Sequence, residues 1–311
     1  MNRKILFSLL GLVLLIASAC NTSRSLTDGI SFKKGDTYTF KQESNTKSMV
    51  SVMGQDVENN QKQVYVYENK VENVLPNGDV EMTSTIKGIE YEMESMGTKM
   101  SYSSMDESKN ENADQLKGIY SAMIGRQFKM VLDSKGQLKG FSGADAMIED
   151  MTTKMKEEGI STDALEMMKN QFNDKEMQQT FGANMSSLLP TTPVKVGDSW
   201  NKTTKMKMLG LKFDTKYTLD KVQDGKAYLS IASTGTPIPD AEPMKMMGME
   251  MKYNLTGTQT GNAVVDLKTG FPINSNLNQD FDGTMTMSGG MLPGEMDADM
   301  SVKGTVKFVQ Q

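Results

Sequence analysis

Residues 64–82 read VYVYENKVENVLPNGDVEM, and this stretch decides the fold. Period-two runs of apolar residues flank the turn Pro76-Asn77-Gly78-Asp79, where Asn-Gly accepts the positive φ angles of a tight hairpin. Alternation places one face of each strand against a core and the other in water, as is typical of antiparallel sheets. We therefore predict a β-hairpin at this turn, within an antiparallel sheet that has one wet face.

The same alternation recurs on both sides of the hairpin. It appears in residues 30–40, 89–93 and 128–132, and it returns after Pro193 in several runs that end with Val302–Val309. These patterns predict two strand-rich halves, which cover residues 30–143 and 191–311.

Between the halves, residues 144–190 change to a helical period. Ala144, Met147, Ile148 and Met151 trace one helical face, and Asn173 with Glu176 three residues later resembles a capping box. The predicted fold class is α+β: a curved, half-barrel-like antiparallel sheet from two related halves, with a helical segment between them. The relation between the halves rests on repeated turns, above all Gly35-Asp36 and Gly197-Asp198. Generic Gly-Asp turns are the alternative explanation, and the shared order of the repeats favours duplication.

The N-terminus has the order of a secretory signal peptide. Arg3 and Lys4 precede an uncharged apolar run that is too short to span a bilayer, and Ala17-Ser18-Ala19 stands directly before Cys20. This junction resembles the lipobox of bacterial lipoproteins. The resemblance implies that residues 1–19 are removed, that Cys20 is lipidated, and that residues 20–29 form a tether. The alternative is an ordinary signal peptide with a coincidental cysteine.

Composition excludes several classes of function. The chain has no histidine and one cysteine, so disulfides, thiolate metal sites and the commonest general base are missing once Cys20 is lipidated. A formal net charge of −5 with mixed signs gives no electrostatic footprint for nucleic acid. We expect a protein that is not an enzyme, uses no cofactor and contacts the membrane through its N-terminal lipid.

Methionine is the unusual residue, with 29 in the chain. Met247, Met249 and Met251 would share one face of a strand, where flexible thioethers suit an apolar ligand. Soft sulfur ligands also bind Cu(I), so a periplasmic copper-binding protein is the alternative, although the usual histidine is missing. Trp200 is a candidate ligand platform or a core aromatic residue at the start of a strand.

Two acidic patterns give weaker evidence for a functional site. Asn278–Gly283 resembles the start of a calcium loop, but Gly289 stands where a bidentate acid is required, and a wet strand face explains the pattern better. Carboxylate pairs such as Glu92 and Glu94 leave a carboxylate-dependent hydrolase as a third candidate.

The phrase from Leu189 to Trp200, the turn at 133–143 and the lipobox together resemble uncharacterised lipoproteins of Bacteroidota, a domain-of-unknown-function family. The resemblance implies a cell-envelope location, lipid-anchored at the outer membrane and facing the periplasm, because no acidic cluster follows Cys20. At fold level the chain is more distantly similar to LolA-like and LppX-like half-barrel carriers. We therefore expect a non-catalytic module that binds an apolar ligand or an envelope partner.

Overall fold

The computed structural model describes residues 26–52, 54–157, 169, 173–178, 188–206, 209–246, 249–289 and 294–311. In chain order the elements are β1 (Thr37–Val52), β2 (Gln55–Val74), β3 (Val80–Ser95), β4 (Thr98–Ser103), a 3-10 turn (Glu107–Lys109), α1 (Asp114–Met123), β5 (Gln127–Leu132), β6 (Leu138–Ser142), α2 (Ala144–Glu157), β7 (Ser199–Met206), β8 (Leu211–Gln223), β9 (Lys226–Pro237), β10 (Met244–Met246), β11 (Met249–Asp266), β12 (Pro272–Gly289) and β13 (Met296–Gln310).

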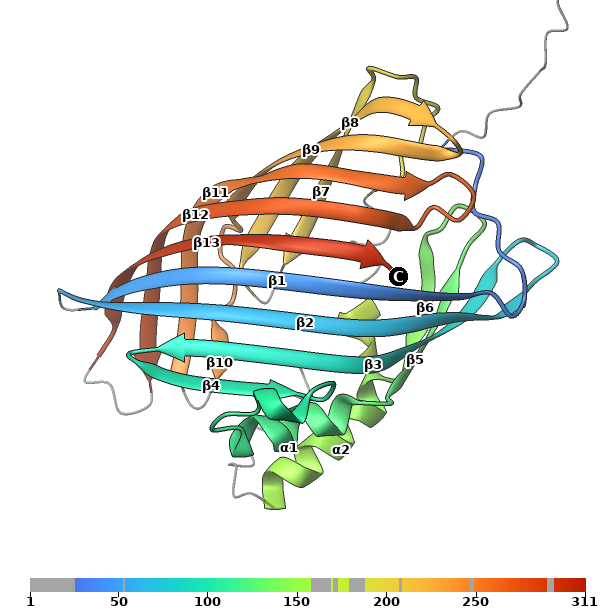
Figure 1. Ribbon diagram of the computed structural model, residues 1–311. Helices are drawn as coiled ribbons and strands as arrows, with labels where there is room; N and C mark the ends of the chain where they lie inside the picture. The colour runs from blue at the N-terminus through green and yellow to red at the C-terminus, as the bar shows by residue number, and fades with distance from the viewer. Residues whose placement is uncertain are drawn as a thin grey trace, which may run out of the picture.

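All of these strands belong to one antiparallel sheet of 13 strands. Its order is β6-β5-β3-β2-β1-β13-β12-β11-β9-β8-β7, with β4 added beside β3 and β10 beside β11. Figure 1 shows the sheet curving into a deep trough, with β13 lying beside β1 and the two helices gathered below β4. The first and last strands therefore join the two strand-rich regions into one surface.

The predicted α+β class is wrong, because the described protein is mainly β. Strands reach 20 residues in β2 and 18 in β11 and β12, whereas the described part of the predicted helical segment supplies α2, of 14 residues, and a short helical stretch at residues 174–178. The helical period was read correctly in Ala144, Met147, Ile148 and Met151, which are buried. They pack against Phe128 and Phe141 of the sheet instead of forming a layer of their own.

The hairpin at residues 75–79 is confirmed. Gly78 has a φ angle of 85°, and the Leu75 amide donates a 2.8 Å hydrogen bond to the Asp79 carbonyl between β2 and β3. The predicted cap at Asn173 is also present, because its side-chain oxygen accepts a 3.0 Å hydrogen bond from the Glu176 amide. Among the described residues, no helix is long and apolar enough to cross a membrane.

Two turns of the sheet are built alike. The Asp36 carboxylate accepts a 3.0 Å hydrogen bond from the Lys33 amide, and the Asp198 carboxylate accepts a 2.8 Å bond from the Lys195 amide. In each turn the glycine before the aspartate has a φ angle close to 90°. These turns introduce β1 and β7 in the same way, one at the middle of the sheet and the other at its edge.

One end of the trough is held by the segment that precedes β1. The Ile30 amide donates a 2.9 Å hydrogen bond to the Ser134 carbonyl, and the Ser31 amide donates a 2.7 Å bond to the Lys268 carbonyl. These carbonyls belong to the β5–β6 and β11–β12 turns, so a short extended segment ties distant parts of the sheet together at this end.

Glycines on the concave side explain part of the curvature. A Cβ on Gly235 or Gly257 would lie within 2.6 Å of the Phe281 ring, so only glycine lets this ring lie across two strands. Phe281 then meets Phe213 edge-on at a centroid distance of 5.8 Å. Aromatic packing over glycine therefore draws β8, β9, β11 and β12 into a curved wall.

Candidate functional site

The two faces of the sheet differ sharply in chemistry. We call the inner face the one that carries Phe40, Phe281 and Val302, and the outer face the opposite one. In the described strands from β2 through β1, β13, β12, β11 and β9 to β8, the directly paired inner positions carry no Lys, Arg, Asp or Glu. The charges fall on the alternating outer positions, for example Asp280 and Lys303. The described inner positions of these seven strands are therefore uncharged.

A row of polar residues nevertheless crosses the inner face. Each member lies directly opposite the next on the neighbouring strand, which makes the row continuous across seven strands. We call this row the polar belt; it consists of Gln61, Thr46, Gln279, Gln259, Ser233 and Thr215, with Gly304 between Thr46 and Gln279. Lys202 of β7, half-buried, lies opposite Thr215 at its far end.

The side chains at the two ends of the polar belt differ in their hydrogen bonding. Thr215 and Ser233 are buried, and their hydroxyl groups form a 2.8 Å hydrogen bond with each other. The amides of Gln61, Gln259 and Gln279 are half-buried and form no side-chain hydrogen bond with any described residue. Three amide groups that both donate and accept hydrogen bonds are thus directed into the trough without a partner in the part of the chain that the structure describes.

A cavity of about 610 Å³ lies at the polar belt. Thr46, Gln61, Gly304 and Gln279 line it together with Met93, which pairs directly with Gln61 on the inner face. Charged residues at neighbouring positions of the strands also line it, namely Lys47, Lys62, Glu92, Glu94, Lys99 and Lys303. This volume is in the range of small-molecule sites, which are usually about 300–1,000 Å³. The cavity can accept a ligand of moderate size that contacts both amides and apolar side chains.

An apolar surface continues from the polar belt along the strands. Two residues beyond Gln279 and Gly304 lie Phe281 and Val302, which pack in one cluster. A second cluster follows toward the strand ends and is rich in thioethers; it contains Val50, Val52, Met244, Met251, Tyr253, Met285, Met287, Ala298 and Met300. The inner face therefore offers a polar row and a wide, pliable apolar wall beside it.

The predicted methionine site is placed only in part. Met251 is buried in the thioether cluster, where the Tyr253 hydroxyl lies 4.0 Å from its sulfur. Met249 is half-buried on the same face of β11, and Met247 lies outside the described residues. The structure surrounds Met251 with apolar side chains, and their role in binding stays a prediction.

Trp200 lies away from the cavity. It opens β7 and stacks on Tyr217 with a centroid distance of 5.7 Å and an interplanar angle of 20°, in a cluster with Leu26 and Val194. Its indole nitrogen is buried and has no hydrogen-bond partner among the described residues. These contacts are those of a core aromatic residue at the start of a strand, the second of the two roles considered from the sequence.

The remaining predicted sites are the lipidation site Cys20 and the acidic pattern at residues 278–283. Cys20 lies outside the described residues. Asn278, Asp280 and Asp282 are exposed on the outer face of β12, as expected for a wet strand and not for a calcium loop. No cluster of three or more acidic residues suited to a metal ion occurs in the part of the chain that the structure describes.

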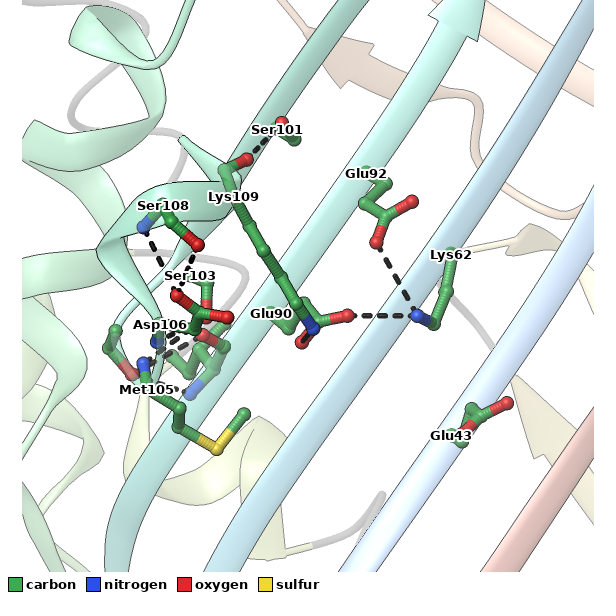
Figure 2. A network of polar contacts seen from close by, with 12 residues as sticks. Glu43, Lys62, Glu90, Glu92, Ser101, Ser103, Met105, Asp106, Ser108 and Lys109 are labelled. Carbon is green, nitrogen blue, oxygen red and sulfur yellow. Dashed lines mark hydrogen bonds and ion pairs between the residues drawn. The ribbon is translucent and has the colours of Figure 1, made fainter. Parts of the chain in front are cut away.

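The outer face buries the carboxylate of Glu90, which Figure 2 shows from close by. Glu90 of β3 accepts hydrogen bonds from Lys62 at 2.8 Å and from Lys109 at 2.9 Å. Burial alone would raise the pKa of Glu90, but the hydrogen bonds and charges of these lysines outweigh it and lower the pKa to about 2. Lys109 belongs to residues 103–111, which we call the strap.

The strap crosses the outer face and is anchored at several points. The Met105 sulfur lies where a side chain of Gly88 would otherwise stand, at 2.6 Å from the ideal Cβ position. Ser101 exchanges two backbone hydrogen bonds with Glu111, at 2.8 and 3.0 Å. Glu90 therefore holds a structural cover on the outer face, and its partner Lys62 also lines the cavity.

Sequence reasoning missed the polar belt. Its signal is a polar residue in the apolar phase of a strand, as in Leu277-Asn278-Gln279-Asp280-Phe281, where Gln279 shares the face of two apolar neighbours. That signal is visible in each strand alone. The alignment of such residues into one row depends on strand register, which the sequence does not display.

Comparison with solved structures finds weak likenesses. A lipovitellin structure described as showing lipid–protein interactions aligns with a TM-score of 0.48 at 10% identity, over 90% of this chain and 25% of that chain. This chain thus spans about a quarter of that protein's length. An outer-membrane channel from Pseudomonas putida F1 aligns at 5% identity with a TM-score of 0.27, over 91% of this chain and 98% of that one.

The translocator domain of the autotransporter NalP from Neisseria meningitidis aligns at 8% identity with a TM-score of 0.20, over 90% of this chain and 91% of that one. All three likenesses are too weak to assign a fold or a function. No curated protein sequence matches the chain. A family of unknown function, DUF6263, matches residues 77–272, and since this is more than half of the sequence, the chain belongs to that family.

Proposed function

We propose that this protein is a non-catalytic binding module that holds an apolar or amphipathic molecule in its trough. The observation that supports the proposal best is the broad apolar wall of the inner face, which lies beside a cavity of about 610 Å³. Burial of apolar ligand surface there supplies roughly 25 cal/mol for each Å² removed from water. The thioether-rich part of the wall adapts to ligands of different shape.

The test is the titration of a neutral, apolar, solvatochromic naphthylamine probe into the full chain without detergent. The matched variants are Val302→Lys on the inner face and Ser301→Lys on the outer face, at neighbouring positions of β13. We expect the wild type and Ser301→Lys to bind the probe, and Val302→Lys to lose binding at least about tenfold because it places a charge in an apolar wall. Equal binding by both variants contradicts the proposal, provided that thermal unfolding shows both to be folded.

We further propose that the module is lipid-anchored in the cell envelope. The support is the sequence Ala17-Ser18-Ala19-Cys20 after a short apolar run. Fractionation of cells that express the wild type or Cys20→Ala tests it. The wild type should sediment with membranes and carry acyl mass on Cys20, and the variant should become soluble after export. A variant that stays in the membrane fraction, beside a wild type without acyl mass, contradicts the anchor.

A copper-binding protein remains the alternative function. The thioether cluster brings Met244, Met251, Met285 and Met287 together, which is the observation in its favour. Their neighbours Val50, Val52 and Ala298 are apolar, and this environment fits a flexible lining for organic ligands. We therefore place apolar binding first.

A further inference from the structure

The segment before β1 begins at one corner of the sheet. Leu26, the first described residue, is buried in one cluster with Leu219 and Ala227. Leu219 lies near the end of β8, and Ala227 is the second residue of β9, so these partners flank the β8–β9 turn. Figure 1 shows the segment, in dark blue, running from the ends of these strands to β1. The chain therefore enters the described fold at this place, which we call the β8–β9 corner.

Two exposed valines lie at the same corner. Val196, in the turn that introduces β7, is 58% exposed, and Val222, near the end of β8, is 39% exposed. Val222 pairs directly with Ala227 of the cluster. The amide of residue 197, next to Val196, donates a 2.7 Å hydrogen bond to the Leu219 carbonyl. Single exposed apolar side chains are ordinary, but these two adjoin the point where the chain enters the fold.

Charge does not oppose contact of this corner with a membrane surface. The turns before β7, between β8 and β9, and between β11 and β12 carry lysines and aspartates in equal number, namely Lys195, Lys221, Lys226, Lys268, Asp198, Asp220, Asp224 and Asp266. The whole chain, in contrast, has a formal net charge of −5. Anionic lipid therefore does not repel these turns as it repels an acidic surface.

We propose that the β8–β9 corner, with Val196 and Val222, rests on the lipid head-group region of the membrane that anchors the chain. This inference rests on the proposed acylation of Cys20 and names the surface that meets the bilayer. Leu26 follows Cys20 by six positions, and an extended chain covers about 3.6 Å per residue, so the corner lies within about 20 Å of the acylated cysteine. Apolar contact of the two valines with the interface adds to the attachment by the acyl chains.

The same contact directs the other end of the strands away from the membrane. A strand rises about 3.3 Å per residue, so the 13 residues of β8 span roughly 40 Å. The turn between β3 and β4, which precedes Thr98, lies at the other end of the strands and is separated from β8 by several strands of the sheet. The thioether cluster also lies toward that end, where Met251 of β11 pairs with Met287 of β12. The thioether-rich part of the trough therefore faces away from the bilayer.

Fluorescence quenching on the acylated full chain tests this contact. Cys20 is the single cysteine, and acylation blocks its thiol, so one introduced cysteine carries a bimane fluorophore. The labelled protein is reconstituted into vesicles of phosphatidylethanolamine and phosphatidylglycerol, in which a fraction of the head groups bears a nitroxide quencher. We expect Gln223→Cys, at the corner, to lose more than half of its emission, and Thr98→Cys, at the far turn, to keep nearly all of it.

A further pair of variants tests the valines themselves. Val196→Asp with Val222→Asp, in the Gln223→Cys background, should recover most of the emission, because a carboxylate resists transfer from water into the interface. The matched control is Met206→Asp, an exposed apolar position at the other end of β7, which should leave the quenching unchanged. Thermal unfolding shows whether each variant keeps the fold.

The outcomes separate this contact from the anchor. Equal losses of emission in the two reporter variants, a larger loss in Thr98→Cys, or quenching that persists in the double-aspartate variant overturns the inference, even when mass spectrometry finds acyl chains on Cys20. If mass spectrometry finds no acyl chain on Cys20, the anchor itself fails, and the assigned contact fails with it.

Discussion

The inner and outer faces share one backbone, yet they bury their residues by different means. On the inner face, curvature brings apolar side chains such as Phe213 and Phe281 against each other, and the polar side chains from β2 to β8 are uncharged. On the outer face, charged side chains remain in water except at Glu90, where the strap covers a carboxylate and supplies Lys109 as a partner. The inner face is therefore suited to contact with apolar ligands, whereas the outer face is suited to contact with water.

The largest effect should come from the aromatic packing of the inner face. Phe281→Ala removes a ring that covers Gly235 and Gly257, and we expect the free energy of unfolding to fall by about 3–5 kcal/mol. Asp282→Ala, at the next and exposed position, should change it by no more than about 0.5 kcal/mol. Denaturant unfolding of both variants measures the difference, and similar losses at the two positions would break the distinction between the faces.

The outer face should respond next at its buried carboxylate. Glu90→Gln weakens two charge-assisted hydrogen bonds, and we expect a loss of about 2 kcal/mol in the free energy of unfolding at neutral pH. Glu94→Gln, which is exposed on the same strand, is the control and should lie within about 0.5 kcal/mol of the wild type. A neutral result for Glu90→Gln would show that the strap does not depend on this charge.

The same pair gives a pH dependence with a defined sign. The pKa of Glu90 is lowered in the folded protein, from about 4.5 to about 2, so its ionised form stabilises the fold above the unfolded pKa. The difference in unfolding free energy between wild type and Glu90→Gln should therefore be constant near neutrality and shrink as the pH falls from about 4.5 to about 2. A difference that stays constant through this range contradicts the assigned role of the two lysines.

The smallest effect should come from the thioethers. Met249→Leu with Met251→Leu keeps the apolar character of the wall, and we expect a loss of less than about 1.5 kcal/mol in stability with probe binding retained. Cu(I) titration of both proteins decides the alternative function, because copper needs the sulfur itself. If the wild type binds Cu(I) stoichiometrically and the variant does not, copper binding becomes the preferred function.

Local features of the fold could be predicted from the sequence, whereas its class could not. The Asn77-Gly78 hairpin, the cap at Asn173 and the apolar stripe of α2 each depend on residues close together in the chain. The predicted fold class is wrong because the helical periodicity in residues 144–190 was taken to mean that helices make up a large part of the fold. The pairing of β1 with β13 joins residues at opposite ends of the sequence, and no local pattern indicates it.

The candidate site illustrates the same division. The methionines and Trp200 were singled out because their residue types are unusual, but Trp200 belongs to a core cluster with Tyr217. The polar belt consists of ordinary glutamines, serines and threonines. Only strand register, for example Gln259 opposite Gln279 and Thr46 opposite Gly304, brings them into one row. Site prediction therefore failed where long-range pairing decides the geometry.

Photolabelling tests the central claim most directly, namely that the inner face is the ligand surface. The full chain is irradiated with an alkyl diazirine, whose carbene inserts where the apolar probe resides, and the adducts are located by tandem mass spectrometry. We predict adducts on inner residues such as Met93, Met300 and Val302, which an excess of the naphthylamine probe suppresses as competitor, and none on the outer neighbours Asp299 and Ser301. Adducts distributed equally over both faces, or not suppressed by the competitor, would contradict the account.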